Sequence, residues 1–175
     1  MSKKIGLFFG TDTGNTEMVA NKIKEKMDSI LGYDAVDVIE IYKKEPSDLE
    51  NYEHVIIGMP TWYDGELQGD WEAFLPKWEA VNFTNKKMAF FGLGDQYGYS
   101  FYFCDALGIF YTIAKEHGAE VFGETNTEGY EYDASKAEIE GKLCGLCIDI
   151  DNQDELTESR IDNWIPEILN GFKLV

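Results

Sequence analysis

The sequence predicts an α/β fold of the doubly wound type, in which a five-stranded parallel sheet carries helices on both faces. Short apolar runs alternate with amphipathic helical patterns along the chain, which indicates repeated strand–helix units. The apolar runs are nearly continuous, as expected of strands buried on both faces. With 175 residues, of which 44% are hydrophobic and 27% charged, the chain has the length and composition of one globular domain spanning residues 1–175.

Five buried strands are expected, and each has the apolar character of the first. That strand reads Lys-Ile-Gly-Leu-Phe-Phe and begins at the fourth residue of the chain. The expected strands cover residues 4–9, 35–41, 54–59, 87–93 and 120–122, and the last of them resumes at residues 143–148. Since the crossovers between parallel strands are right-handed, only a few doubly wound strand orders are expected.

Helical periodicity fills the segments between these strands. The expected helices cover residues 15–31, 47–51, 70–81, 103–117 and 156–170, and the second of them is a short turn. The side chains expected on buried faces include Val19, Ile23, Met27 and Ile30 in the first helix, Trp71, Phe74, Leu75 and Trp78 in the third, and Ile161, Trp164, Ile165, Ile168 and Leu169 in the last. Asp70 is the expected N-cap of the third helix.

The pattern breaks at residues 123–142, which are polar and contain several Gly, Asn and Thr residues. Compact domains rarely contain a structureless loop of this length without a specific reason. We therefore interpret the segment as an insertion that splits the fifth strand.

The formal net charge of −18 disfavours several classes of partner. The phosphate backbone of nucleic acids and anionic membrane surfaces would be repelled, whereas a basic protein would be attracted. On charge alone, the alternative that acidity only keeps the chain soluble stays open. No stretch is long and apolar enough to be inserted in a membrane, and no signal peptide precedes the first strand, so the expected location is the cytoplasm.

Three cysteines, Cys104, Cys144 and Cys147, are too few and odd in number for a disulfide scaffold. Cys144 and Cys147 form a C-x-x-C, but they lie in an expected strand, where residues i and i+3 face opposite sides about 10 Å apart. A disulfide needs Cα atoms within about 7 Å, so no redox or metal role is expected of this pair.

A loop rich in hydrogen-bond donors joins the first strand to the first helix. It reads Gly-Thr-Asp-Thr-Gly-Asn-Thr over residues 10–16. Exposed amides at a helix N-terminus bind anions, Gly14 lets an oxygen approach the backbone, and the side chains of Thr11, Thr13, Asn15 and Thr16 add donors. No lysine follows Gly14, so the loop is not the nucleotide-hydrolysing Walker A motif. It suits a terminal phosphate held by hydrogen bonds, or it only caps the helix.

Two aromatic loops are expected beside it, because open α/β sheets bind ligands beyond the carboxyl ends of their strands. The loop after the third strand reads Pro-Thr-Trp-Tyr-Asp-Gly over residues 60–65, and the loop after the fourth reads Gly-Asp-Gln-Tyr-Gly-Tyr over residues 94–99. Trp62 and Tyr99 could each cover one face of a flat ring, which stacking stabilises by roughly 0.5–1.5 kcal/mol. Together the three loops predict a site for a flat aromatic ligand with a terminal phosphate.

These motifs resemble those of the long-chain flavodoxins. Residues 8–17 resemble the phosphate loop of that family, and residues 60–63 and 94–99 resemble its two flavin loops. The segments at 103–108 and 149–153 are also similar to long-chain members, and residues 123–142 match the insertion that distinguishes them from short-chain members. The resemblance implies a flavodoxin-like doubly wound sandwich with strand order 2-1-3-4-5, and one non-covalently bound flavin mononucleotide (FMN).

The resemblance also implies roles for individual residues. Threonines and Asn15 of the first loop would bind the FMN phosphate, Trp62 and Tyr99 would enclose the isoalloxazine ring, Asp95 would meet its pyrimidine edge, and Asp149 would contact the ribityl chain. The full set of residues expected at the cofactor is Thr11, Asp12, Thr13, Gly14, Asn15, Thr16, Pro60, Thr61, Trp62, Tyr63, Gly65, Gly94, Asp95, Tyr99, Tyr102, Cys104 and Asp149.

Asp64 departs from the family pattern, which often has an apolar or aromatic residue there. The peptide between Tyr63 and Asp64 falls where the family makes its redox-dependent contact with flavin N5, and Gly65 would ease the turn. A carboxylate that faces the ring would oppose the addition of negative charge to it. The alternative is a solvated loop acid with no effect.

The resemblance implies an electron-transfer protein that carries single electrons at low potential. The implied partners of this monomer are basic-surfaced redox proteins such as ferredoxin-NADP reductase, photosystem I, nitrogenase reductase or 2-oxoacid oxidoreductase. The alternative is an FMN-dependent NAD(P)H:quinone reductase, which needs an open ring face, whereas Trp62 and Tyr99 would cover both. A flavin-free response regulator needs an acidic pocket after the first strand, where Gly-Thr-Asp-Thr stands instead.

Overall fold

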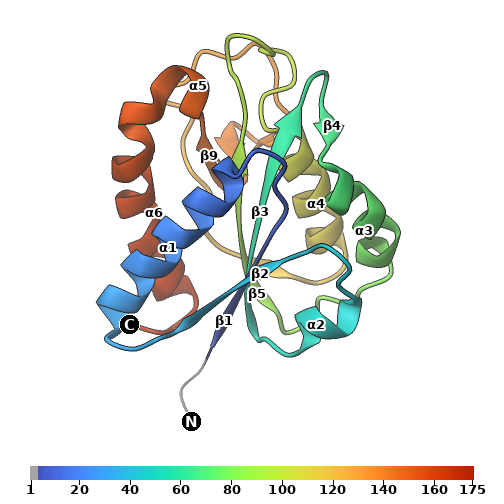
Figure 1. Cartoon of the computed structure of the whole chain (residues 1–175), viewed down its shortest axis with the longest axis vertical. Helices are drawn as coiled ribbons and strands as arrows, with labels where there is room; N and C mark the ends of the chain where they lie inside the picture. The colour runs from blue at the N-terminus through green and yellow to red at the C-terminus, as the bar shows by residue number, and fades with distance from the viewer. Residues whose placement is uncertain (1–3) are drawn as a thin grey trace.

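A parallel sheet with the strand order β2-β1-β3-β5-β6 forms the centre of the molecule in this computed structural model, which describes residues 4–175 (Figure 1). Its strands are β1 Ile5–Phe9, β2 Val36–Glu40, β3 His54–Trp62, β5 Lys87–Leu93, β6 Glu120–Val121 and β9 Leu146–Ile148. Ile5 is paired with Val36 on one side and with His54 on the other. The predicted fold class is confirmed, and so is the order 2-1-3-4-5, since β5 is the predicted fourth strand.

The fifth position of the sheet is shared by two short strands. β6 pairs with Lys87 and Met88 of β5, and β9 pairs with the end of the same strand, from Phe91 to Leu93. The chain leaves the sheet between them, so the predicted insertion is confirmed. Within it, β7 Glu138–Ile139 and β8 Lys142–Leu143 form an antiparallel hairpin.

The expected strand at residues 143–148 is wrong in its first half. Leu143 ends the hairpin of the insertion, the chain bends at Cys144 and Gly145, and only residues 146–148 join the sheet. The bend needs a glycine, because a Cβ at position 145 would lie 2.1 Å from the carbonyl oxygen of Phe90. The two cysteines of the C-x-x-C therefore do not share one strand. All three cysteines of the chain are buried free thiols.

Helices cover both faces of the sheet. They are α1 Asn15–Leu31, α2 Pro46–Glu50, α3 Gly69–Glu79, α4 Asp105–Glu116, α5 Ile150–Gln153 and α6 Thr157–Gly171, with the 3-10 turn Asp154–Leu156 between the last two. Figure 1 shows α1 and α6 on one side of the sheet and α3 and α4 on the other. Alternate residues of a strand contact the helices on opposite faces of the sheet. Ile5, Leu7 and Phe9 pack on the side of α1 and α6, and Phe8 packs on the side of α3 and α4.

Three helical details differ from the sequence expectation. Ile30 is 45% exposed rather than buried. Leu75 is half-buried rather than buried. The N-cap of α3 is Gln68 and not Asp70, since the Gln68 side chain accepts a hydrogen bond from the Trp71 amide. The two-residue strand β4 Glu66–Leu67, which pairs with the end of β3, was not expected.

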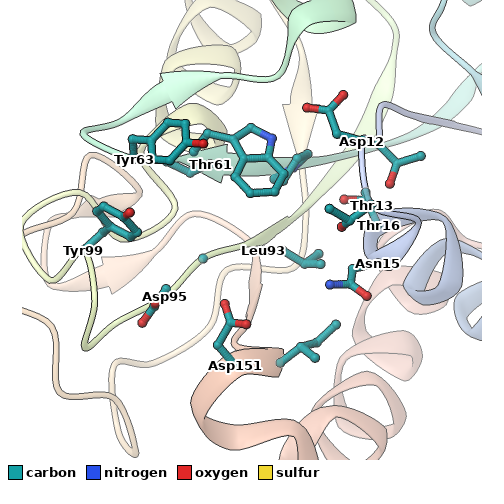
Figure 2. Close-up of a pocket in the computed structure, with 15 residues that line it drawn as sticks. Asp12, Thr13, Asn15, Thr16, Thr61, Tyr63, Leu93, Asp95, Tyr99 and Asp151 are labelled. Atoms are coloured by element: carbon teal, nitrogen blue, oxygen red, sulfur yellow. The ribbon is translucent and has the colours of Figure 1, made fainter.

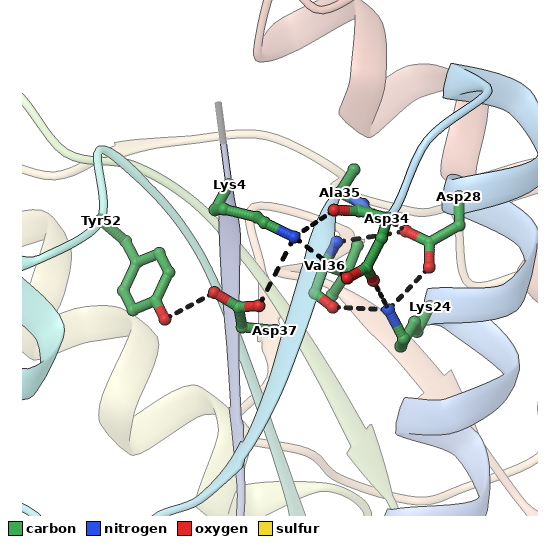
Figure 3. A network of polar contacts seen from close by, with 8 residues as sticks. All are labelled: Lys4, Lys24, Asp28, Asp34, Ala35, Val36, Asp37 and Tyr52. Carbon is green, nitrogen blue, oxygen red and sulfur yellow. Dashed lines mark hydrogen bonds and ion pairs between the residues drawn. The ribbon is translucent and has the colours of Figure 1, made fainter. Parts of the chain in front are cut away.

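A polar network fixes the edge strand β2 to α1 and β1 (Figure 3). Asp28 accepts hydrogen bonds from the amides of Ala35 and Val36 at 2.8 and 3.1 Å, and it pairs with Lys24 at 2.7 Å. Lys24 and Lys4 both contact Asp34, and their hydrogen bonds lower the pKa of that carboxyl. Asp28 thus supplies acceptors for the amides at the start of the strand.

Two features are absent from residues 4–175. No helix in this range is both long and apolar enough to cross a bilayer. No group of three or more His, Cys, Asp or Glu side chains in the same range is arranged to hold a metal ion.

Candidate functional site

A cavity lies where β1, β3 and β5 end, at the carboxyl edge of the sheet. Its volume is about 560 Å³, including space open to solvent. Four segments meet there: the loop after β1, the end of β3, the loop after β5, and the start of α5. Figure 2 shows Tyr63 and Tyr99 at one end of this cavity and Thr13, Asn15 and Thr16 at the other.

Twelve of the seventeen residues predicted from the sequence line the cavity. They are Thr11, Asp12, Thr13, Asn15, Thr16, Pro60, Thr61, Trp62, Tyr63, Gly94, Asp95 and Tyr99. Three further lining residues, Leu93, Ile150 and Asp151, were missed. The predicted residues that do not line it are Gly14, Gly65, Tyr102, Cys104 and Asp149, and each of them lies just behind or beside the lining.

The loop after β1 presents the N-terminus of α1 to the cavity. Gly14 caps the helix with φ at 90°, a conformation that favours glycine, and its amide donates to Thr11 Oγ1 at 2.9 Å. The first helical hydrogen bond runs from the Met18 amide to the Gly14 carbonyl. The amides of the first turn therefore have no partner within the helix and can bind an anion.

Gln68 positions this loop, and sequence reasoning missed it. Its side chain is 2% exposed and donates to Asp12 Oδ1 at 3.1 Å and to Asp70 Oδ2 at 2.9 Å. A Cβ on Gly10 would lie 2.3 Å from Gln68 Oε1, so the loop packs directly against this amide. Since Gln68 also caps α3, it links that helix to the loop after β1. A single polar residue between two elements has no periodicity, so the sequence carried no signal for this role.

The tip of the β3–β4 hairpin, residues 63–65, lies beside the cavity. Trp62 pairs with Glu66, and the turn between them has positive φ at Tyr63 (43°) and at Gly65 (85°). A Cβ on Gly65 would lie 2.9 Å from Asp105 Oδ2, so both the backbone conformation and the space require glycine there. Asp64 is exposed and does not line the cavity.

Aromatic side chains form one end of the cavity. The ring centroids of Trp62 and Tyr63 are 6.1 Å apart, and Tyr63 meets Tyr99 edge to face at 6.0 Å. Tyr99 is 39% exposed, so its ring has room to cover a ligand. The indole Nε1 of Trp62 is buried and has no hydrogen-bond partner among the described residues. A buried donor without a partner is costly, so this atom calls for an acceptor supplied by a ligand or water.

Carboxylates complete the lining, to which residues 4–175 contribute no basic side chain. Burial alone would raise the pKa of Asp95, but hydrogen bonds from Gly98, Asn152 and Tyr97 hold it below its usual value. The pKa of Asp151 is raised by burial and by the charges of Asp95 and Asp149. These carboxylates therefore make the electrostatic potential in the cavity more negative, which opposes the addition of an electron to anything bound there.

Asp149 lies behind the lining rather than in it. Its side chain is 0% exposed and accepts hydrogen bonds from Gln96 Nε2 at 2.8 Å and from the Asn152 amide at 3.1 Å. Cys104 lies behind Gly94, where a Cβ would be 3.0 Å from the Cys104 amide nitrogen. Burial raises the pKa of the Cys104 thiol. The contact between Asp149 and a ribityl chain stays a prediction, and the neighbouring Asp151 faces the cavity instead (Figure 2).

Comparison with known proteins identifies the family to which this site belongs. A family model described as Flavodoxin matches residues 7–164. This chain belongs to the flavodoxin family. The flavodoxin of Haemophilus influenzae is 47% identical over 171 residues, which cover 97% of this chain and 96% of that protein. A flavodoxin of Nostoc sp. is 44% identical, covering 99% of this chain and all of that protein.

Solved flavodoxin structures agree with this architecture. The Fusobacterium nucleatum flavodoxin bound to flavin mononucleotide has a TM-score of 0.86 and 34% sequence identity, covering 96% of this chain and 98% of that chain. A variant of the same protein, also bound to flavin mononucleotide, has a TM-score of 0.88 at the same identity. Flavodoxin membership is thus supported by sequence and by structure over nearly the whole chain.

Proposed function

We propose that the cavity binds FMN and that the chain is a low-potential one-electron carrier between redox proteins. One observation supports this function above the others. The cavity joins a cation-free, donor-rich helix start to an aromatic end, and it does so in a flavodoxin fold. FMN has the matching form, with a phosphate at one end and a flat ring at the other.

The residues present fit this group. The first-turn amides of α1, with Thr13, Asn15 and Thr16, would hold the phosphate without a cation, and the unpartnered Trp62 Nε1 would find an acceptor. Trp62 and Tyr99 would cover the ring. When bound, FMN supplies the redox chemistry by accepting and releasing electrons one at a time.

The chain's own contribution is electrostatic and steric. Asp12, Asp95 and Asp151 line the cavity, and no lysine or arginine among residues 4–175 does. At about 10 Å and an effective dielectric constant of about 40, each carboxylate adds about 0.8 kcal/mol to the cost of an electron on the ring. That corresponds to about 35 mV for each carboxylate, which lowers the potential of the carrier.

The quinone-reductase alternative is not favoured. Flavodoxins are electron-transfer proteins rather than enzymes, and Trp62 and Tyr99 would cover both faces of the ring, which leaves little room for a second substrate. We further propose a single-domain cytoplasmic monomer that meets basic redox proteins such as ferredoxin-NADP reductase, photosystem I, nitrogenase reductase or 2-oxoacid oxidoreductase. The net charge of −18 supports basic partners.

Three measurements on the purified protein test this function. Calorimetry of the flavin-free protein should give one FMN per chain and much weaker binding of riboflavin, which lacks the phosphate. A reductive titration should show two separate one-electron potentials. Oxidation of NADPH with a quinone should need an added reductase. Equal affinities for the two flavins would overturn the phosphate assignment, and turnover without a reductase would favour the enzyme.

A further inference from the structure

Part of the insertion runs beside the loop that carries Tyr99. We call residues 131–136 the strap. The strap lies beside residues 96–105 and runs in the same chain direction. Hydrogen bonds join the two segments along the length of the strap. These run from the Glu131 amide to Gln96 Oε1 (2.6 Å), from the Ala134 amide to the Ser100 carbonyl (3.0 Å), from the Phe103 amide to the Ala134 carbonyl (3.3 Å) and from the Lys136 amide to Asp105 Oδ1 (2.7 Å).

Gln96 is the only buried member of the 94–99 loop that bonds to the strap through its side chain. It is 0% exposed. Its Nε2 donates to Asp149 Oδ2 at 2.8 Å and to Gln153 Oε1 at 2.9 Å, and its Oε1 accepts from the Glu131 amide. Both donors and the acceptor of this amide are thus satisfied by three partners from two other segments. Because one partner is a carboxylate and another is an N–H group, the orientation of the amide is determined.

The loop between Gln96 and the cavity is short and internally bonded. The Tyr99 amide donates to the Asp95 carbonyl at 3.0 Å, and the Gly98 amide donates to Asp95 Oδ1 at 2.7 Å. A displacement of Gln96 would therefore move the whole turn and, with it, the Tyr99 side chain at the aromatic end of the cavity. The phosphate end lies on α1, which the strap does not contact through any of the hydrogen bonds given above.

We propose that the strap is a positioning element for Tyr99, acting through the buried amide of Gln96. The effect on flavin binding rests on the proposed function; the effect on the loop itself does not. Burying the Gln96 acceptor without its partner would cost a hydrogen bond and loosen the 95–99 turn. Since the ring end of the cavity would change and the phosphate end would not, affinity for FMN and for riboflavin should fall by the same factor.

The contact of Glu131 through its backbone allows a matched pair of variants. Glu131→Pro removes the amide donor, whereas Glu131→Ala keeps it and removes only the side chain, with its bond to Tyr97. We expect Glu131→Pro to weaken both flavins by about fivefold to tenfold relative to Glu131→Ala. In the flavin-free protein, amide hydrogen exchange across residues 95–99 should be faster in Glu131→Pro than in Glu131→Ala.

Gln96→Glu provides a second variant of the same shape in case Glu131→Pro does not fold. It keeps the acceptor for the Glu131 amide but places a carboxylate against Asp149. It should also speed exchange at residues 95–99 and weaken both flavins equally. If the folded variants keep the wild-type amide exchange at residues 95–99 and the wild-type flavin affinity, the strap does not position Tyr99. A loss of affinity confined to FMN would also contradict the proposal. A wild-type protein that binds no FMN would instead refute the proposed function, and the exchange measurement would still decide on the strap.

Discussion

At the scale of single residues, the aromatic pair at the cavity makes the most direct prediction. Trp62→Ala and Tyr99→Ala should each weaken FMN binding by about twofold to tenfold, because stacking contributes roughly 0.5–1.5 kcal/mol beyond the burial of area. Both substitutions should also increase the fluorescence of bound flavin, since contact with these rings quenches it. Tyr42→Ala is the control, because Tyr42 is exposed and does not line the cavity. If neither cavity variant changes fluorescence or affinity, the ring does not lie between these side chains.

Two aspartates form a second pair at this scale. Asp64 is exposed and does not line the cavity, whereas Asp151 does. At pH 7 to 8, Asp151→Asn should raise the potential of the second electron by about 35 mV if the carboxylate lies about 10 Å from the ring. Asp64→Asn should change it far less, since water screens the group. Potentiometric titration at low salt checks both. Equal shifts would contradict the negative field assigned to the cavity lining.

At the scale of secondary-structure elements, Gln68 joins α3 to the loop that precedes α1. Gln68→Leu removes the cap from the Trp71 amide and the donor to Asp12. We expect the free energy of unfolding in urea to fall by about 1–3 kcal/mol, because buried polar groups lose their partners. The phosphate end should suffer most, so FMN affinity should fall more than riboflavin affinity. Gln153→Leu is the comparison: it removes a partner of Gln96 beside the loop that carries Tyr99, so it should weaken both flavins equally. If Gln68→Leu lowers the affinity for FMN and for riboflavin equally, Gln68 does not act at the phosphate end.

Elements were predictable from the sequence where they are long and periodic. The bounds of α1 were correct, and the inward faces of α6 were correct at Trp164 and Ile168, because burial of an amphipathic face determines both. The short strand β4 and the bend at Gly145 were not predictable, since they depend on contacts with distant parts of the chain. The three loops of the site were recognised by their motifs, but the inward turn of Asp149 was not, because it depends on Gln96 as a partner.

At the scale of the whole molecule, we expect the net charge of −18 to control the rate at which the protein meets a charged redox partner. Electron transfer to a basic haem protein, used as a probe, should slow steeply as ionic strength rises from about 0.01 M to about 1 M. The Debye length falls over this range from about 30 Å to about 3 Å. Stopped-flow measurement of the electron-transfer rate checks this. An acidic acceptor provides the control, because its rate should rise or stay constant as ionic strength increases. A rate independent of salt would exclude electrostatic steering.

The stability of the whole molecule should decline at alkaline pH. Burial and the hydrogen bond to Asp37 raise the pKa of Tyr52 to about 12, and burial also raises the pKa of Tyr130 and Tyr132. Below the unfolded value of about 10, both states are protonated and the full stability is present. Above it, the unfolded state loses protons first, so the free energy of unfolding falls as pH rises from about 10 toward 12. Urea unfolding at several pH values should show a shallower decline in Tyr52→Phe. An unchanged slope would exclude Tyr52.

The spacing between β6 and β9 along β5 determines whether the segment between them can be deleted without a shift of strand register. Val121 pairs with Met88 and Leu146 with Phe91, so two positions of β5 separate the halves. The Phe122 amide already bonds to the Met88 carbonyl at 2.9 Å. If Phe122 were spliced directly to Gly145, these two residues would fill those positions, and every later side chain would keep its face of the sheet. Removal of the segment 123–144 would therefore leave the register of the sheet unchanged. Genetic exchange at this junction can shorten the chain or replace the segment with foreign sequence without a shift of strand register.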